Sequence, residues 1–377
     1  MNRACYFYGM KHLLLFFATL LSSCLTCTAQ ENQPDVDEER GERVEVPADL
    51  SRFERKTPSA LRLAFYNLEN LFDTQDDTLI NDEEFVSGGM KGWSETRFRH
   101  KINNHAKTLI ALGGWEAPAI IGFCEVENRE VIHRLITETS LKDINYQIIH
   151  ENSPDRRGID VCLIYRPDKI KIVNHHYGRV SMPQEPELRT RDFLYMKGVV
   201  FEKDTIHVFY NHWPSRMGGQ QSSEPKRLFV AQLIRNMCDS LLKDNPNANI
   251  LISGDLNDEP GDKSVAEVLK GKPSNANLNP GDFVNLMYEA WEKGVGTEKY
   301  QNHWGMLDQW LVSRALFKRE KGLVVDGGTA GIFNAPWLIE KDERYLGEKP
   351  YRTFSGPKYL GGHSDHFPVY IDLVRTK

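Results

Sequence analysis

The sequence lacks several features that mark specialised classes of protein. Lysine and arginine number 47 against 53 acidic residues, so the formal net charge of −6 excludes a histone-like basic protein. Only one apolar run approaches the length that spans a bilayer, which excludes a polytopic membrane protein. Internal repeats and low-complexity tracts are also missing. The 377 residues are 40% hydrophobic and 10% aromatic, enough for a sizeable core, and this composition excludes wholesale disorder, collagen and coiled coil.

Cysteine is scarce, with six in all, and three of these lie in the first 30 residues. The others are Cys124, Cys162 and Cys238, and their spacing matches no zinc motif. Because Cys124 and Cys162 fall in strand-like apolar runs, we expect all three to be buried as small hydrophobic residues. A disulfide between two of them is left open.

The first 30 residues have the pattern of an export signal. Arg3 and Lys11 precede an apolar stretch, Leu13–Leu21, which is too short to span a bilayer core of ~30 Å, and small residues follow it. Two processing routes are open: cleavage after Ala29 by an ordinary signal peptidase, or lipidation of Cys24, which ends a lipobox-like sequence. A short buried N-terminal helix is the remaining alternative.

Export by either route predicts a location in the periplasm, at the outer membrane as a lipoprotein, or outside the cell. Removal of residues 1–29 takes away two positive charges and no acid, which changes the net charge from −6 to −8. In the lipidated case the N-terminal lipid would be the membrane tether. No protein partner is implied, and we expect a monomer.

The rest of the chain divides into a linker and one domain. Residues 30–58 are dense in charge and poor in apolar residues, as is typical of a flexible linker. From residue 59 to residue 377, strand-like runs such as Leu61–Tyr66 alternate with helical periods such as Arg97–Leu112 and Lys226–Leu242. This mixture predicts a layered α/β (α+β) domain in which two sheets are faced by helices.

Short apolar strands repeatedly lead into polar clusters. The clusters begin at Asn67, Glu125, Asn211 and Gly254, and a last one, ending at His366, comes just before a strand. Strand ends on one edge of a sheet bring their side chains into one cleft. Carboxylates, amides and histidines without cysteine suit a hard cation such as Mg²⁺ or Mn²⁺. A hard cation beside histidines suits phosphoryl chemistry.

These clusters resemble those of the endonuclease/exonuclease/phosphatase superfamily, which has the deoxyribonuclease-I-like fold. Six matching segments occur in the family's order over about residues 61–375: Asn67-Leu68-Glu69-Asn70, Glu125-Val126-Glu127-Asn128, Asn211-His212-Trp213-Pro214-Ser215-Arg216, Gly254-Asp255-Leu256-Asn257, Leu307-Asp308-Gln309 and Ser364-Asp365-His366. One such segment occurs by chance, whereas six in order form a specific signal. The resemblance implies a four-layer αββα sandwich.

The resemblance also implies a metal site. Glu125 would be the principal ligand of Mg²⁺ or Mn²⁺, with Asn67 and Asp365 nearby. A salt-bridged carboxylate at a strand end is the alternative for Glu125. Glu127 is a weaker ligand candidate, and an acid in a loop or at a helix start is its other interpretation.

The same resemblance assigns catalytic roles to five residues. Asp255 and Asn257 would hold the attacking water and a phosphate oxygen, although an Asx turn is the alternative for this pair. Asp308 would orient His366 and fix its tautomer. His366 would then act as a general base on water or as a cationic clamp on phosphate. His212 would donate a proton to the leaving oxygen or stabilise the pentacovalent state.

Three arginines are candidates for binding the substrate phosphate. Arg216 and Arg227 belong to a loop with two glycines and to the helix start that we expect after it. Guanidinium matches phosphate oxygens bidentately, and a helix N-terminus adds amide donors. Arg191 resembles a phosphate-contact position of the family.

Two further residues have open interpretations. Asp160 either supports His212 or pairs with a neighbouring arginine. His363 is flanked by glycines, and we expect it at the surface.

The sequence therefore favours an exported, metal-dependent phosphodiesterase, a nuclease that cleaves DNA or RNA by in-line attack of water. The acidic chain argues moderately against a polyanionic substrate. The alternative is the same chemistry on a phosphomonoester, an inositol phosphate or a phospholipid head group. A non-catalytic binding protein would require the loss of a key residue, and none is missing. Segments Asp76–Trp93 and Gly327–Arg352 resemble family-variable loops, which we expect to set specificity.

Overall fold

The computed structural model describes residues 49–317 and 321–376, and one compact unit covers Pro47–Lys377. The expected export signal and lipidation site lie outside the described residues, as does most of the expected linker. None of the helices in the described part of the chain has the length and apolar character needed to cross a membrane.

Two seven-stranded mixed sheets form the centre of the unit. The first sheet contains, in spatial order, β14 (Gly322–Val325), β20 (Val369–Thr376), β1 (Leu61–Leu71), β2 (Ile120–Val126), β4 (Asp160–Tyr165) and β3 (Gln147–His150), and β15 (Gly331–Ile332) also pairs with β20. The second contains β5 (Ile170–Gly178), β6 (Phe193–Val200), β7 (Asp204–His212), β8 (Asn249–Asp255), β13 (Asp308–Ser313), β10 (Phe283–Asn285) and β9 (Gly271–Lys272).

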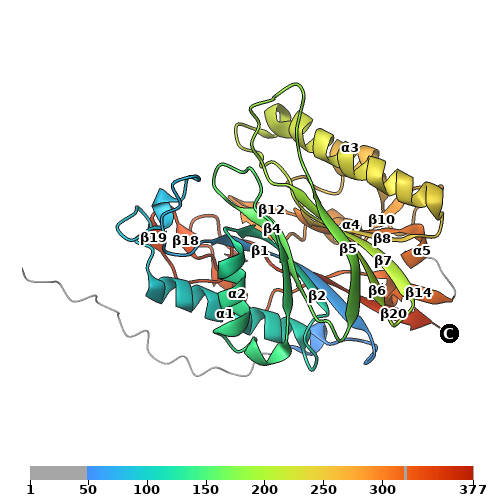
Figure 1. The fold of residues 1–377 in the computed structure, drawn as a ribbon, viewed down its shortest axis with the longest axis horizontal. Helices are drawn as coiled ribbons and strands as arrows, with labels where there is room; N and C mark the ends of the chain where they lie inside the picture. Colours follow the sequence, from blue (N-terminus) through green and yellow to red (C-terminus); the bar gives the residue numbers. More distant parts are fainter. Residues whose placement is uncertain (1–48, 318–320, 377) are drawn as a thin grey trace, which may run out of the picture. The chain divides into compact units, whose positions relative to one another are not determined.

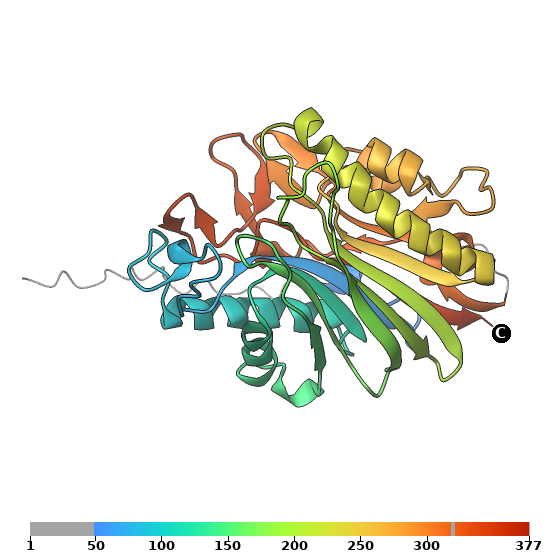
Figure 2. The same cartoon turned by 45° about the horizontal axis from the view of Figure 1, so that its top comes forward.

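Helices cover the outer face of each sheet (Figure 1). The helices are α1 (Glu95–Gly113), α2 (Arg129–Thr137), α3 (Gln220–Asp244), α4 (Tyr288–Glu292) and α5 (Arg314–Phe317). Figure 2 shows α1 and α2 on the outer side of the first sheet and the long α3 on the outer side of the second. The four-layer αββα sandwich expected from the sequence is therefore confirmed.

Smaller elements complete the chain. Three two-stranded hairpins pair β11 (Glu298–Tyr300) with β12 (His303–Gly305), β16 (Ile339–Lys341) with β17 (Glu348–Pro350), and β18 (Phe354–Ser355) with β19 (Lys358–Tyr359). Short 3₁₀ turns occur at Ser51–Phe53, Glu83–Phe85, Lys142–Ile144, Asp326–Gly328 and Pro336–Leu338, and a π turn occurs at Ser264–Val268.

The alternation of side chains along β1 explains how one strand serves two cores. Leu63 and Phe65 point into the core between the sheets, whereas Ala64 and Tyr66 belong to the core under α1 and α2. The sheets approach so closely at Gly122 of β2 that a Cβ there would lie 2.3 Å from the Tyr210 ring on β7. Glycine is therefore required at this crossing.

Helix α1 begins where the sequence provides a cap. The Ser94 side chain accepts a hydrogen bond from the Arg97 amide at the helix start. The buried face of α1 carries Phe98, Ile102, Ala106 and Leu109, spaced at three to four residues as an amphipathic helix requires.

The domain begins earlier than the sequence suggested. The linker was expected to reach residue 58, but Phe53 is 5% exposed and its ring lies 4.5 Å from that of Phe333. The Arg62 guanidinium also donates to the Phe53 carbonyl oxygen at 2.8 Å. A single aromatic residue in a charged stretch gave no periodic signal, so the sequence could not predict this contact.

Candidate active site

Strand register places three of the expected catalytic residues in one row of the second sheet. β7 and β8 run parallel, and their register pairs His212 with Asp255. β13 runs antiparallel to β8 and starts at Asp308, which is the register partner of Asp255. The three side-chain positions therefore lie on neighbouring strands at the carboxyl ends of β7 and β8.

The first sheet contributes its own strand ends to the site. β1 and β2 are parallel, and Asn67 pairs with Cys124, the residue before Glu125. β20 runs antiparallel to β1, so the segment just before β20 returns to the end of β1. There the Ser364 hydroxyl donates to the Asn67 carbonyl oxygen at 2.7 Å. This contact holds Asp365 and His366 at the same edge.

The backbone at these strand ends adopts conformations that most residues avoid. Gly254 has φ 147°, and a Cβ there would lie 2.2 Å from the Asn211 carbonyl oxygen, so only glycine fits before Asp255. Glu125 and Asn257 have φ values of 59° and 49°. Left-handed non-glycine residues concentrate at functional sites, where the surrounding structure holds them in place.

Asp308 and His366 form the shortest contact of the expected catalytic set. His366 Nδ1 lies 2.6 Å from an Asp308 carboxylate oxygen, and both residues are buried. Burial disfavours charge on the imidazole, but the carboxylates of Asp308, Asp255 and Asp365 together outweigh burial, with Asp308 contributing most, and the pKa of His366 is raised well above its usual value. With Nδ1 bound to Asp308, His366 Nε2 is left 3.9 Å from the Asp255 carboxylate.

Asp255 lies at the centre of the row. Its carboxylate accepts hydrogen bonds from the Asn257 amide at 3.0 Å and from the Asn67 side chain at 3.2 Å. Burial raises the pKa of Asp255 to about 6, and the His366 charge opposes this rise. The Asx turn considered for Asp255 and Asn257 is thus present, together with a link to the first sheet.

His212 lies between two carboxylates. Its Nε2 atom is 3.6 Å from Asp255 and 3.9 Å from Glu125. Burial lowers the pKa of His212 well below its usual value, and the nearby Arg191 and Arg157 lower it further. The two histidines of the site therefore differ: the environment favours a neutral His212 and a charged His366.

Carboxylates are concentrated at this edge, and their donor set fits a divalent cation. One Glu125 oxygen accepts the Asn70 amide at 2.9 Å, and the other faces His212. Asp365 and Asp308 each have one buried carboxylate oxygen without a hydrogen-bond partner among the described residues. Such oxygens suit Mg²⁺ or Mn²⁺, which bind carboxylates and water.

Two groups in the described chain bring possible ligand atoms within 4.8 Å of one another. The first joins Asp255, Asp308 and His366, and the second joins Cys124, His212 and Asp255. Cys124 is a free, buried thiol whose pKa is raised well above the usual value, mainly by burial. Cys162 and Cys238 are also free and buried, so the expectation of small buried hydrophobic residues is confirmed for all three.

The three expected phosphate-binding arginines have different environments. Arg216 lines the cleft beside Asn257 and His366, where it donates to the Asn257 carbonyl oxygen at 2.7 Å and pairs with Asp262 at 2.8 Å. This cleft has a volume of about 630 Å³. Arg216 is thus the expected arginine that reaches the open side of the site.

Arg227 does not reach the cleft. Its side chain is fully buried and pairs with Asp258 at 2.7 Å. The sequence placed Arg227 at a helix start, whereas α3 begins at Gln220, so this residue lies two turns inside the helix. Arg191 is also buried: it pairs with Asp155 at 3.1 Å and donates to the Trp213 carbonyl oxygen.

Two open interpretations are now decided by contacts. Asp160 lies 3.0 Å from His150 Nε2 and accepts the Ser153 amide, so neither His212 nor a neighbouring arginine is its partner.

His363 is buried at 6% exposure and lies 3.0 Å from the Thr108 hydroxyl of α1, so the expected surface position was wrong. A Cβ at Gly362 would lie 2.2 Å from the Tyr351 carbonyl oxygen, so this glycine marks close backbone packing and not exposure.

Glu127 sits beside the site and not in it. Its carboxylate accepts the Asp73 amide at 2.6 Å, and burial raises its pKa to about 8. The helix α2 that follows is capped by Asn128, which accepts the Val131 amide. Glu127 therefore matches the interpretation of a loop acid near a helix start.

Sequence reasoning missed other charged residues around the centre. Glu298 on β11 lines the cleft and forms a backbone bridge with His366, and burial raises its pKa to about 7. Glu69 is buried and accepts the Thr353 amide, and Lys101 donates to the Glu69 carbonyl oxygen. Glu69 could have been proposed as a site residue, because it belongs to the first polar cluster. Glu298 lies in a segment without periodicity, so no sequence pattern pointed to it.

The chain matches the model of the endonuclease/exonuclease/phosphatase family over residues 62–375. No curated protein matches its sequence. Among solved structures, it is similar to D. rerio TDP2 in complex with a single-strand DNA product, at 13% identity and TM-score 0.51, covering 84% of this chain and 99% of the other.

Two Bacteroides thetaiotaomicron structures are similar to the same degree. An endonuclease/exonuclease/phosphatase family protein has 15% identity and TM-score 0.50, covering 84% of this chain and 98% of the other. A mannosyl-6-phosphatase has 16% identity and TM-score 0.50, covering 83% and 99%. At such identities the likeness shows the fold, and the family match carries the assignment. The chain therefore belongs to the endonuclease/exonuclease/phosphatase family, whose members hydrolyse phosphate esters.

Proposed function

We propose that the chain is an exported, divalent-metal-dependent phosphodiesterase that hydrolyses nucleic acid by in-line attack of water. The observation that carries this proposal is the Asp308–His366 pair at 2.6 Å, set beside Asp255 and His212 at one sheet edge. A buried histidine held by a carboxylate and facing a second carboxylate suits proton transfer and charge stabilisation at phosphorus. Export rests on the N-terminal sequence pattern alone.

Glu125, Asn67 and Asp365 would hold the cation. Mg²⁺ or Mn²⁺ bound there would polarise a phosphate oxygen and neutralise the charge that develops on it. The buried, unpartnered oxygen of Asp365 supports this assignment, because such an atom is costly without a ligand. Asn67 links the ligand set to Asp255 through the bond at 3.2 Å.

Four side chains would supply the roles in the reaction that the metal ion does not. Asp255 would accept a hydrogen bond from the attacking water and orient it, and Asn257 would hold a phosphate oxygen. His366, with its Nδ1 bound to Asp308, would present Nε2 to the phosphate as a cationic clamp. His212 would contact the departing oxygen from the Glu125 side. The raised pKa of His366 supports the clamp over the alternative of a general base.

The proposal is tested with the chain from residue 30 onward on two substrates, bis-(p-nitrophenyl) phosphate and p-nitrophenyl phosphate. Each is assayed with Mg²⁺, with Mn²⁺ and with EDTA. We expect metal-dependent cleavage of the diester, lost in EDTA, with oligodeoxynucleotides and oligoribonucleotides as the next substrates. Preference for the monoester would contradict the phosphodiesterase and indicate a phosphatase acting on small metabolites.

A further inference from the structure

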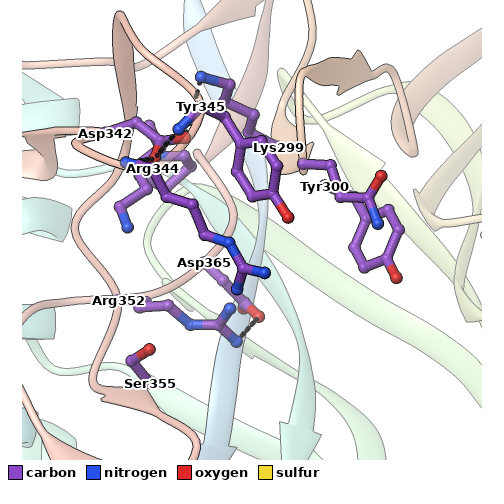
Figure 3. Close-up of a pocket in the computed structure, with 11 residues that line it drawn as sticks. Lys299, Tyr300, Asp342, Arg344, Tyr345, Arg352, Ser355 and Asp365 are labelled. Carbon is purple, nitrogen blue, oxygen red and sulfur yellow. Dashed lines mark hydrogen bonds and ion pairs between the residues drawn. The ribbon is translucent and has the colours of Figure 1, made fainter.

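A second pocket of about 410 Å³ lies next to the catalytic cleft (Figure 3). Cationic and aromatic side chains dominate its lining: Lys299, Tyr300, Arg344, Tyr345, Lys349 and Arg352. The lining of this pocket meets the lining of the cleft at two points. Tyr300 lines both the pocket and the cleft, and the pocket-lining Asp365 directly precedes His366. The two linings therefore adjoin, so one substrate can extend from His366 into the pocket.

The pocket carries excess positive charge. Four cationic residues line it, against two acids, Asp342 and Asp365. Lys299 is neutralised by Asp342 at 3.1 Å, and both side chains are almost fully buried. Arg352 is shared between Asp365 at 2.8 Å and Glu69 at 3.4 Å. These two cations are therefore committed to protein partners.

Arg344 differs from Lys299 and Arg352 in its contacts. Over residues 49–317 and 321–376, its guanidinium makes no ion pair and no hydrogen bond, and its one contact of note is with the Tyr345 ring at 5.2 Å. Figure 3 shows the side chain extending into the pocket toward Arg352 and Asp365. A guanidinium directed at a second guanidinium, with its donors free, is arranged to bind an anion bidentately.

The loop that carries Arg344 is organised to present it. The Asp342 carboxylate accepts the backbone amides of Arg344 at 3.2 Å and Tyr345 at 3.1 Å, besides its pair with Lys299. The Lys299 ammonium also donates to the Leu346 carbonyl oxygen at 2.8 Å. The loop is thus tied to β11, the strand that contributes Tyr300 and Glu298 to the cleft.

We propose that this pocket binds a second phosphate of the substrate, adjacent to the phosphate that is cleaved. Arg344 is the principal contact, and Tyr300 and Tyr345 flank the group between the two phosphates. This inference rests on the proposed function and names a substrate class for it: phosphoesters with two phosphates. A neighbouring phosphate of a nucleic acid and the second phosphate of a small bisphosphate supply the same chemistry.

The test compares thymidine 5′-(p-nitrophenyl phosphate) with the same compound carrying a 3′-phosphate. We expect the 3′-phosphate to raise kcat/KM in the natural protein roughly tenfold or more, as one charge-assisted contact would. Arg344→Gln should abolish this preference and leave cleavage of the simpler compound unchanged. Arg344→Lys should restore part of it. Lys341→Gln removes the same charge from an exposed position outside the pocket and should keep the preference.

The possible results distinguish failure of this inference from failure of the proposed function. Equal rates on the two compounds, or a preference that survives Arg344→Gln, would overturn the pocket assignment even though both compounds are cleaved. Cleavage of neither compound would instead overturn the phosphodiesterase. Competition by thymidine 3′,5′-bisphosphate and by a hexose 1,6-bisphosphate distinguishes the sources. Selective competition by the nucleotide indicates nucleic acid, and equal competition indicates that phosphates alone are recognised.

Discussion

The environment of His366 decides how charge is distributed at the proposed reaction centre. The imidazole is buried, which disfavours the charged form, and three carboxylates together favour it, chiefly Asp308 at 2.6 Å and also Asp255 and Asp365. The carboxylates nearest His212 Nε2 are farther away, Asp255 at 3.6 Å and Glu125 at 3.9 Å, and the pKa of His212 is lowered mainly by burial. The surroundings thus favour opposite protonation states for the two histidines, in keeping with the proposed roles of His366 at the phosphate and His212 at the departing oxygen.

Replacement of Asp308 by Asn tests this division. The amide oxygen can still accept from His366 Nδ1, but the negative charge is gone, so the pKa of His366 should fall. We expect kcat to drop by roughly 10²- to 10⁴-fold, the usual contribution of a positioned acid or base. The measurement is the His366 ring resonance across pH, with the His363 resonance as an internal control. An unchanged His366 titration would refute the pairing.

Arg227 offers a second test at the same scale. It pairs with Asp258 at 2.7 Å in a fully buried site, so Arg227→Met leaves the buried Asp258 carboxylate with the more distant Arg216, at 3.6 Å, as its cationic partner. We expect a loss of about 3–5 kcal/mol in the free energy of unfolding. The double variant Arg227→Met, Asp258→Leu should recover part of the loss in urea titrations. A stable Arg227→Met protein with a raised KM would favour the substrate-binding role expected from sequence instead.

At the scale of elements, strand polarity explains most of the site. β7 and β8 end together because they are parallel, and β13 starts at that edge because it is antiparallel to β8. The sequence predicted the clusters at the ends of β7 and β8 because each follows an apolar strand, whereas Asp308 was expected from the family resemblance. The hairpin β11–β12 and the loop after β16 contribute Glu298 and Arg344 to pockets beside the centre. Short irregular segments have no periodicity, so their residues could not be predicted.

Strand β7 also carries a pH-sensitive residue away from the site. His207 lies 2.8 Å from the Tyr195 hydroxyl, and burial lowers its pKa to about 4, against about 6.5 in an unfolded chain. Below pH 6.5 the unfolded chain binds a proton that the folded chain does not. Stability therefore falls as pH decreases from about 6.5 to about 4.

The variant His207→Gln should remove this dependence. We expect its deficit in unfolding free energy relative to the natural protein to be smaller at pH 5 than at pH 8, as measured by urea unfolding. His175→Gln, at an exposed position on the same sheet, controls for the loss of a histidine. A deficit of the same size at both pH values would contradict the assigned cause.

At the scale of the whole molecule, the boundary of the domain is a testable consequence of packing. The compact unit begins at Pro47, and Phe53 contacts Phe333. A chain that starts at residue 47 should unfold at the same temperature as one that starts at residue 30. A chain that starts at residue 59 loses the Phe53 contacts, and we expect it to be less stable by about 3 kcal/mol or more. Equal melting temperatures for all three chains would show that residues 47–58 contribute nothing.

The sequence predicted the fold and the residues at the centre of the candidate site better than it predicted where elements begin and which residues surround the site. Alternating periods predicted two sheets faced by helices, and the family resemblance carried by six ordered clusters implied the four-layer sandwich. The helix start was placed at Lys226, not Gln220, because Pro225 and the preceding serines favour a loop locally. That difference of six residues moved Arg227 from the expected substrate side into the core.

The central claim is that the pair Asp308–His366 makes this chain a phosphoesterase. The most direct test is the rate of bis-(p-nitrophenyl) phosphate cleavage with Mg²⁺ by the natural protein, His366→Gln and His363→Gln. The two variants make the same change three residues apart, and His363 contacts Thr108 of α1 and not the row of catalytic candidates. We predict a loss of several orders of magnitude for His366→Gln only, with the fold intact by circular dichroism. Near-full activity of a folded His366→Gln protein would contradict the account.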